Sequence, residues 1–492
     1  MTDLAAELNR LDPARAWEPW EPTPADPWDL RWAGHLYRRA AFGGSLPELK
    51  AAVKAGPDAA VERLFAGGPG QAEFDQLMDA VAPGSAQPRQ PGNPNADPLG
   101  VDLEGWWLHR MAATPHPLLE RLTLFWHNHF ATSVAKVKLT ALMRDQNLTL
   151  RRHALGPFGP LVQAMSQDPA MLVWLDSNSN VRGRANENYA RELMEIFCLG
   201  VGAYTEADVR EVARAFTGWH TNAATGDAGY NPQDFRPAFT FLASQHDGGD
   251  KTVLGKTGKW DGTDVVRIVT GHPACARYVV RKLYRGFVGE AADPPDKLLA
   301  PLVARFRQSD LDVADVLKVM LRSRHFYSAS AFRQRVKGPV EYTVGLLRGL
   351  EARMPTGAVG LSLAAATQDL GQTLFAPPTV KGWDGGPAWL NTAATLARHN
   401  TAWRLVQDAD PYQVRINPAA LAARHAKAQD PAGQAAFLLD LLLQPAPGEI
   451  NPQVAAKLTA FLGDGNPQGP ARDRRLREAA HAVAALPLFQ LA

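Results

Sequence analysis

Residues 186–216 read NENYARELMEIFCLGVGAYTEADVREVARAF, and this stretch decides the fold class. Apolar residues recur in its first half at helical spacing, a glycine ends the pattern, and Asn186 is a suitable N-cap, so we expect a helix over residues 186–200. Thr205 opens a second helix, because Asp208 stands three residues later as the partner in a capping box. Two helices with so short a connection predict an antiparallel helical hairpin.

The rest of the chain is patterned in the same way. Ser45 and Glu48 form a second capping box, and further helical patterns cover residues 101–138, 264–352, 361–371 and 387–408. Two short β-rich pieces, residues 239–242 and 251–254, flank a Gly-rich turn and predict one hairpin. The expected fold is therefore mainly α, a multi-helix bundle-like body with one small inserted β-hairpin near residues 239–254.

Composition shifts divide the chain. Residues 1–30 are rich in Pro and Trp and predict a tail that lies on the surface with its Trp side chains docked. Residues 31–492 are expected to form a single large helical unit. Within it, residues 80–100 predict a linker or loop, and residues 221–262 predict a Gly-rich insertion that carries the hairpin.

Charge and cysteine content exclude several classes of protein. The 492 residues hold 52 Lys plus Arg against 50 Asp plus Glu, a net charge of +2, so we expect no nucleic-acid partner. Two cysteines cannot build a disulfide framework or a four-thiolate zinc site. The sequence shows no apolar run long enough for a membrane span and no secretory signal, so a cytoplasmic location is the default expectation.

His127 and His129 are the first candidates for chemistry, as metal ligands. On the helix expected here, two residues at i and i+2 point to nearly opposite sides, so both bind one metal only if the helix ends at this point. The alternative is structural. In that interpretation His129 is a hydrogen-bonded core residue on the apolar stripe, and His127 is solvated on the polar side.

The acidic helix offers a second set. Glu187, Arg191 and Glu195 follow i, i+4 spacing, which is typical of a ladder of surface ion pairs. Alternatively, Glu192 and Glu195 project together, as carboxylates do in helical metal sites. Glu187, Arg191 and Glu192 are therefore candidates for catalysis, and Glu192 and Glu195 for metal binding.

Three further candidates lie in the Gly-rich insertion. His220 is a candidate metal ligand, and the pair His246 and Asp247 is a candidate catalytic acid–base group at the tip of the expected hairpin. The structural alternative is that these residues only form turns, since Asp favours turn starts.

Binding candidates come from two loops. Asn186 and Asn188 belong to a group of asparagines that predicts either a loop or a polar pocket, because a buried amide must be hydrogen-bonded. Lys381 and Trp383 lie in a rigid Pro/Gly-rich loop that either lines a pocket or closes the helical body.

Together these strings resemble a bacterial family called domain of unknown function 1800. The resemblance covers nearly the whole chain and rests on HLYRRAAFG (35–43), FWHNHF (125–130), NENYARELME (186–195), FTGW (216–219) and PPTVKGW (377–383). It implies a mostly helical protein with no firmly assigned activity. It also implies a gene neighbour of the family of unknown function 1501, which resembles alkaline phosphatases and sulfatases. Many members of both families carry export signals, and none is visible here.

Three functions follow as hypotheses. The first is a helical accessory protein that acts with the phosphatase- or sulfatase-like neighbour of family 1501. The second is a metal-dependent enzyme with a His/Glu site and a divalent metal ion as its cofactor. The third is a carbohydrate-binding protein, because the chain has 13 Trp residues and Pro/Gly/Trp loops.

Overall fold

The computed structural model describes residues 4–82, 101–222, 237–354, 359–407, 414–426 and 428–492. The chain is mainly helical with two small antiparallel sheets, which confirms the expected fold class. Within the described residues, no helix has the length and apolar character needed to cross a membrane. The first half of the chain contains α1 (Leu4–Arg10), α2 (Pro13–Ala16), α3 (Leu30–Ala40), α4 (Leu46–Ala55), α5 (Pro57–Ala66), α6 (Gln71–Ala80), α7 (Val101–Ala113), α8 (Pro117–His129), α9 (Val134–Val137), α10 (Thr140–His153), α11 (Phe158–Ser166), α12 (Pro169–Trp174), η1 (Ser177–Ser179), α13 (Asn188–Glu192), η2 (Leu193–Cys198) and α14 (Glu206–Ala215).

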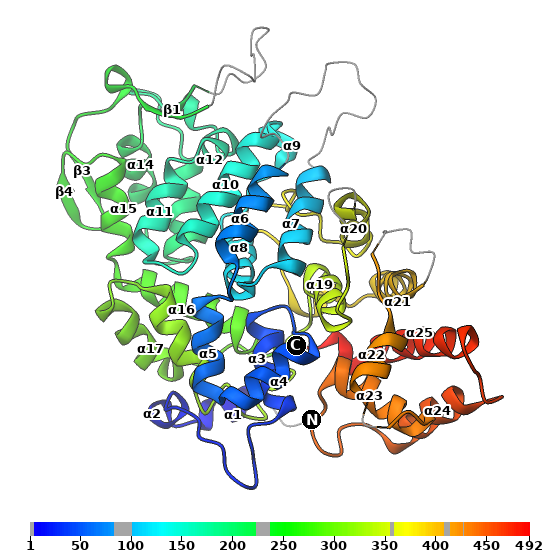
Figure 1. Ribbon diagram of the computed structural model, residues 1–492. Coiled ribbons are helices and arrows are strands. Elements are labelled where there is room, and N and C mark those ends of the chain that lie inside the picture. Colours follow the sequence, from blue (N-terminus) through cyan, green and yellow to red (C-terminus); the bar gives the residue numbers. More distant parts are fainter. Residues whose placement is uncertain (1–3, 83–100, 223–236, 355–358, 408–413, 427) are drawn as a thin grey trace, which may run out of the picture.

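The second half begins with the four short strands and continues with helices to the end of the chain. It contains β1 (Trp219–Thr221), β2 (Phe239–Phe241), η3 (Ala243–Gln245), β3 (Lys251–Val253), β4 (Lys256–Gly258), α15 (Gly262–Thr270), α16 (Pro273–Phe287), α17 (Asp296–Gln308), α18 (Val313–Arg322), α19 (Pro339–Gly349), α20 (Val359–Asp369), η4 (Gly386–Trp389), α21 (Thr392–Val406), α22 (Pro418–His425), α23 (Pro431–Leu443), α24 (Pro452–Gly463), α25 (Pro470–Ala484) and η5 (Pro487–Gln490). In Figure 1 the green helices α14–α17 lie on one side, the yellow to red helices α19–α25 lie on the other, and α8 lies between them.

Helix starts follow the local sequence. Ser45 accepts a hydrogen bond from the Glu48 amide, and the Glu48 carboxylate accepts one from the Ser45 amide, which is the predicted capping box. Thr205 and Asp208 form the same arrangement at the start of α14, as predicted. Such reciprocal caps satisfy amide groups that have no partner within the helix, so each fixes where its helix begins.

The small sheets pair differently from the expected hairpin. β2 pairs with β1 (Trp219 opposite Phe241), and β3 pairs with β4 (Lys251 opposite Gly258). The two pieces expected to pair with each other therefore belong to separate sheets. The strands themselves lie where the β-rich composition placed them, whereas their partners are set by packing that local sequence does not encode.

Two hydrophobic cores meet at α8. Leu118, Leu122 and Trp126 belong to the core that also contains much of α11 and α14–α18. Leu124 belongs to the other core, which contains α7, α19 and α21–α25. Successive faces of one helix thus serve both cores, so the segment at its end is placed where the two halves of the molecule join.

A buried ion cluster locks α8 to its neighbours. The Glu120 carboxylate accepts hydrogen bonds from Arg110 Nε and Arg151 Nε, each at 2.7 Å, and from Trp107 Nε1 at 2.9 Å. Although burial opposes ionisation, the two guanidinium groups lower the pKa of Glu120 to about 2. Because every partner is enclosed, removal of one would leave an uncompensated buried charge.

Residues from three distant parts of the sequence meet at one carbonyl group. The oxygen of Leu443 accepts hydrogen bonds from Arg333 Nη2 at 2.7 Å and from Arg38 Nη1 at 3.3 Å. Both guanidinium groups also lie against the ring of Phe332, at 5.1 and 5.8 Å from its centroid. Three segments far apart in sequence therefore meet at Leu443.

The segments predicted outside the helical body are described only in part. The expected tail, residues 1–30, contains α1 and α2, and Trp17 is buried there with its Nε1 donating to the Leu298 oxygen at 2.6 Å. Most of the expected linker, residues 83–100, lies outside the described residues, as does part of the Gly-rich insertion, residues 223–236.

Candidate functional site

The end of α8 directs three consecutive side chains in three directions. Pro117 occupies the first turn of the helix, and Phe130 caps its end. His127 and His129 point into different cores, and Asn128 between them faces the loop that precedes η4. This confirms that the two histidines lie on opposite sides of the helix. It also means that they do not converge.

His127 is buried, not solvated as expected. Its side chain is 1% exposed and packs edge-on against Trp107, with ring centroids 5.1 Å apart. Its Nε2 accepts a hydrogen bond from the Phe375 amide at 3.1 Å, so the ring proton is on Nδ1. Burial lowers the pKa of His127 to about 3. The prediction was wrong because the segment that covers His127 is almost 250 residues away in the sequence.

His129 is the core histidine that its place on the apolar stripe predicted. It is 2% exposed and is surrounded by aromatic rings, among them Phe130 and Phe197. Its Nε2 donates to the Phe197 carbonyl oxygen at 2.9 Å, so this ring carries its proton on the opposite nitrogen from His127. Burial and the positive charge of Lys282 lower its pKa well below the usual range. Nδ1 of His129 is buried and has no hydrogen-bond partner in the described residues.

Asn128 fastens the Pro/Gly-rich loop to α8. Its Oδ1 accepts a hydrogen bond from the Trp383 amide at 2.7 Å, and its Nδ2 donates to the Trp383 carbonyl at 3.3 Å. Gly382, directly before Trp383, has a φ of +86°, and any Cβ there would overlap the Asn128 side chain. The motifs FWHNHF (125–130) and PPTVKGW (377–383) are therefore in contact here.

The loop presents its two candidate side chains differently. Lys381 is 74% exposed and forms a surface ion pair with Asp384 at 3.1 Å. Trp383 is partly buried, and its ring lies 6.0 Å from the ring of His127. Lys381 is thus free to reorient, whereas Trp383 is held on both its backbone and its ring.

The acidic helix differs from expectation at its start and in its second half. It begins at Asn188, two residues after the expected start, and the Asn186 side chain just before it accepts a hydrogen bond from the Asn188 amide. Residues Leu193–Cys198 form a π-helix, η2. A π-helical turn is rare and is frequent at functional sites. Phe197, whose carbonyl oxygen accepts the hydrogen bond from His129, lies in this π-helix.

The charged residues of this helix divide into two groups. Arg191 pairs with Glu187 at 3.2 Å and with Glu206 of α14 at 2.8 Å, in the manner of a surface ladder. Glu195 accepts a hydrogen bond from the Tyr204 hydroxyl at 2.8 Å. Glu192 has no such partner in the described residues, and burial together with the charge of Glu195 raises its pKa.

The asparagines brace a loop. Asn186 Nδ2 donates to Ser179 Oγ at 2.7 Å, and Asn188 Nδ2 donates to the Asp176 carboxylate at 3.3 Å. Asn180 accepts from the Asn186 amide. Their amides are therefore engaged in holding the segment before α13.

The candidates of the Gly-rich insertion lie beside the end of α14. Asp247 pairs with Arg214 at 2.8 Å, which is the first cause of its pKa falling to about 2. His246 Nδ1 lies 2.9 Å from the Thr217 carbonyl. His220 is on β1, and its Nε2 is buried without a hydrogen bond in the described part of the chain. Asp247 and His246 thus hold the turn after η3 against α14.

Lys282 of α16 is a residue that the sequence reasoning missed. It is partly buried, its Nζ lies 5.3 Å from the ring centroid of Tyr278, and no ion pair or hydrogen bond joins it to another described residue. Burial, then the positive charges of Arg285 and Lys381, lower its pKa to about 7. One signal was available in the sequence: the positions three and four residues before and after Lys282 hold no carboxylate.

The predicted metal ligands do not come together as a site. Among the described residues, no group of three or more His, Cys, Asp or Glu side chains is arranged to hold a metal ion. Both cysteines, Cys198 and Cys275, are buried free thiols.

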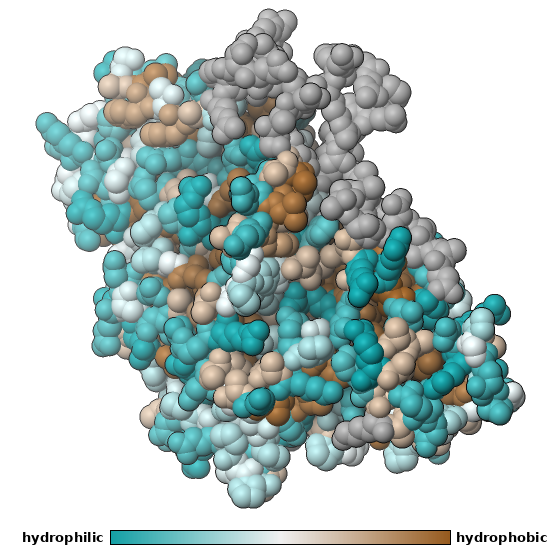
Figure 2. Space-filling model, in the orientation of Figure 1, coloured by the Kyte–Doolittle hydropathy of each residue, from teal (hydrophilic) through white to brown (hydrophobic). Residues whose placement is uncertain are grey.

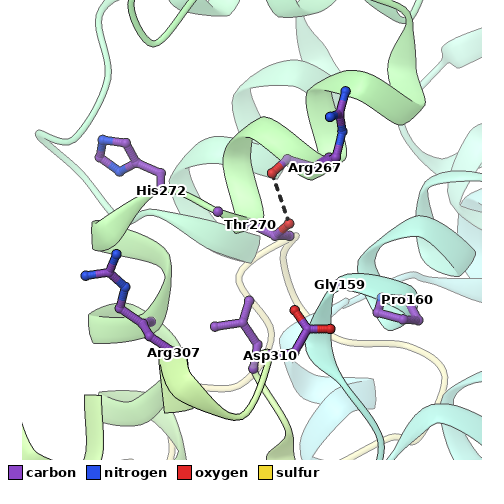
Figure 3. Close-up of a pocket in the computed structure, with 10 residues that line it drawn as sticks. Gly159, Pro160, Arg267, Thr270, His272, Arg307 and Asp310 are labelled. Carbon is purple, nitrogen blue, oxygen red and sulfur yellow. Dashed lines mark hydrogen bonds between the residues drawn. The ribbon is translucent and has the colours of Figure 1, made fainter. Parts of the chain in front are cut away.

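A surface pocket of about 310 Å³ lies elsewhere, and none of the predicted site residues lines it. Figure 3 shows Arg267, His272 and Arg307 around it, on α15, at the start of α16 and on α17. Asp310 is the one acidic side chain among its lining residues. The pocket and the sequence motifs therefore mark different places.

Comparison with known proteins identifies one family. The family model described as "Protein of unknown function (DUF1800)" matches residues 35–491. No curated protein matches the chain. No solved structure matches it.

Proposed function

The chain belongs to the DUF1800 family, and we propose that it is a helical accessory protein that works bound to a partner protein. The partner we propose is the phosphatase- or sulfatase-like protein of family 1501, which the family resemblance implies as a gene neighbour. The observation that carries the proposal is an exposed apolar strip on α21.

The strip consists of Leu390, Leu396 and Trp403, which are 39%, 63% and 39% exposed. Leu396 and Trp403 are seven residues apart and so lie on one face of α21, with Leu390 just before the helix begins. Figure 2 shows hydrophobic surface in the region where Figure 1 places α21.

The opposite face of α21 is anchored in the protein. Arg398, Ala402 and Leu405 are buried, and the Arg398 guanidinium donates to the Lys337 carbonyl at 2.6 Å. The helix is therefore a rigid platform. Clustered exposed apolar side chains mark protein interaction sites, and Trp is the residue type most enriched at the energetic centre of such interfaces.

The alternative functions receive less support. His127 and His129 each contact a backbone group in a different core, as structural histidines do. Trp383 is partly buried beside His127, so its ring is not a free platform for a sugar.

The experiment is a titration with the family 1501 protein encoded beside this chain, purified separately. We expect a saturable complex with the wild-type chain. Leu396→Asp should weaken it at least tenfold, because an interface residue of this kind contributes more than about 1.4 kcal/mol when it is central.

Val201→Asp is the matched control, because Val201 is 85% exposed and lies far from α21 in sequence, on the turn before α14. This variant should bind as the wild type does. A complex that Leu396→Asp leaves unchanged, or no complex at all between the two purified proteins, overturns the proposal.

A further inference from the structure

We propose that the surface pocket between α11, α15, α16 and α17 binds a small zwitterion of the α-amino acid type, with Arg307 and His272 on its carboxylate and Asp310 on its ammonium group. The pocket has a volume of about 310 Å³, at the lower end of the roughly 300–1,000 Å³ that is usual for ligand pockets, so it suits a small molecule. It lies on the other side of the molecule from α21 (Figure 1), and the proposal does not depend on the proposed partner.

Three parts of the chain form the pocket, and contacts between them fix their positions. They are the junction of α15 with α16, the end of α17 with the turn after it, and the first turn of α11. The Phe158 amide donates to the Leu311 carbonyl at 3.0 Å, which joins the start of α11 to the turn after α17. A Cβ on Gly159 would lie 3.9 Å from Thr270 Oγ1, so α11 also packs against the end of α15. The fold therefore brings the lining residues together.

One side of the pocket offers two free donors, Arg307 and His272 (Figure 3). Arg307, in the last turn of α17, makes no ion pair or side-chain hydrogen bond with another described residue. His272 Nδ1 accepts a hydrogen bond from the Ala274 amide at 3.3 Å, so the ring proton is on Nε2. Burial lowers the pKa of His272, which keeps the ring neutral at neutral pH. A guanidinium and a ring N–H together can hold the two oxygens of a carboxylate.

Asp310 offers a free acceptor. It is the one acidic residue among those that line the pocket, and its carboxylate has no partner among the described residues. Figure 3 shows this carboxylate apart from His272 and Arg307 and toward Gly159. Thr270 also lines the pocket, and its hydroxyl donates to the Val266 carbonyl at 2.8 Å, so its oxygen can only accept from a ligand. An ammonium group fits these two acceptors.

The balance of unpaired charges favours a zwitterion over a simple anion or a simple amine. Arg267 is a further cation of the lining, but it is already paired with Asp264 at 2.7 Å. This leaves one unpaired cation, Arg307, and one unpaired anion, Asp310, among the lining residues. Asp310 would repel a phosphate and Arg307 would repel an amine, whereas a molecule that carries both charges can pair with both.

The test is calorimetric titration of the full chain with each standard L-amino acid. The N-acetyl and amide derivatives of the tightest ligand are the matched ligand controls, because the first lacks the ammonium charge and the second lacks the carboxylate. We expect saturable binding of at least one amino acid. Each derivative should bind about tenfold more weakly or worse, since it loses a hydrogen bond between charged groups.

Two variants test the two ends of the ligand separately. Arg307→Met should weaken binding of the amino acid about tenfold or more, yet leave binding of the amide derivative unchanged. Asp310→Asn should weaken binding of the amino acid to a similar extent, yet leave binding of the N-acetyl derivative unchanged. Residue 310 has a φ of +54°, which asparagine tolerates, so this variant should fold. A variant that only disturbs the fold would not show this crossed pattern.

Arg474→Met and Asp473→Asn are the matched control variants, because both residues are exposed on α25, in the other half of the molecule (Figure 1). Their binding curves should equal that of the wild type. The proposal is wrong if no amino acid binds saturably or if the two derivatives bind as tightly as the amino acid. It is also wrong if Arg307→Met or Asp310→Asn binds as tightly as its control.

Discussion

Asn128 and Trp383, which are 255 residues apart, are joined by two hydrogen bonds in opposite directions: the Trp383 amide donates to Oδ1 at 2.7 Å, and Nδ2 donates to the Trp383 carbonyl at 3.3 Å. The Asn128 side chain thus pairs with both backbone groups of Trp383, as a neighbouring β-strand would. Because Asn128 lies between two histidines that point into separate cores, the loop is fixed at the seam between the two halves of the molecule.

Replacing Asn128 by Ala should loosen this loop. Both bonds to Trp383 are lost, and we expect the free energy of unfolding to fall by about 1–3 kcal/mol. Lys381, next to the released segment, is an exposed trypsin site, so cleavage after Lys381 should accelerate. The measurement is limited proteolysis with mass spectrometry of the fragments. Asn188→Ala, which removes a single bond to Asp176, should leave this cleavage rate unchanged; equal rates in the two variants would refute the role of Asn128.

Gly382→Ala should lower the free energy of unfolding much more than Gly371→Ala does. Both glycines have a positive φ, +86° and +95°, so each Gly→Ala change carries a backbone penalty of about 1–2 kcal/mol. Only the Cβ at 382 overlaps Asn128, whereas position 371 has open space around it. Overlap adds about 1–3 kcal/mol. Urea denaturation of Gly382→Ala and Gly371→Ala measures the difference, and equal losses would show that the loop can move away from α8.

His127 should make the protein sensitive to acid. Its pKa in the folded chain is about 3, below that of an unfolded histidine near 6.5, so the unfolded state gains a proton first as the pH falls. The stability that neutral His127 provides is complete above about pH 6.5 and is lost at up to about 1.4 kcal/mol per pH unit towards pH 3. His127→Gln should show a shallower loss, measured by urea denaturation from pH 8 to pH 4. The two curves should run parallel above pH 7, and equal slopes below pH 6 would contradict the prediction.

Asp168 should affect the pH dependence of stability in the opposite direction to His127: its contribution is lost as the pH rises. It caps α12, where its Oδ1 accepts from the Met171 amide at 2.9 Å and from Gln146 Nε2 at 2.8 Å. Burial raises its pKa to about 7, so the folded state holds the proton more tightly, and this contribution to stability is lost as the pH rises from about 4 to 7. Asp168→Asn keeps an acceptor and removes the charge. Its stability relative to the wild type should therefore grow over this range, by on the order of 1–3 kcal/mol, and then level off. A constant difference between pH 4 and pH 8 would show that Asp168 ionises normally.

The helical fold could be predicted because its signals are local. The capping boxes at Ser45 and Thr205 each involve residues only three positions apart, and both form as expected. The start of α13 was missed by two residues. The Asn186 side chain still accepts a hydrogen bond from the amide of Asn188, the first residue of α13, but the helical backbone starts two residues later than expected.

Partners distant in sequence could not be predicted. β2 pairs with β1 across residues 222–238, and nothing in either strand specifies the other. His127 was assigned to a polar face, yet Trp107 and the Phe375 amide enclose it. The environment of the candidate site residues also depends on contacts between residues that are distant in sequence. Lys282 resembles any surface lysine of an amphipathic helix, and the burial that lowers its pKa comes from packing that the local sequence does not encode.

The carbonyl of Leu443 sets an order of events during synthesis. Arg38 emerges early from the ribosome, but the oxygen to which it donates is made more than 400 residues later, and Arg333 must wait for the same group. A guanidinium is not buried before it has a partner, so α3 cannot complete its packing until α23 exists. A nascent chain stalled before Leu443 should therefore keep the surface of α3 around Arg38 open, where chaperones can bind it.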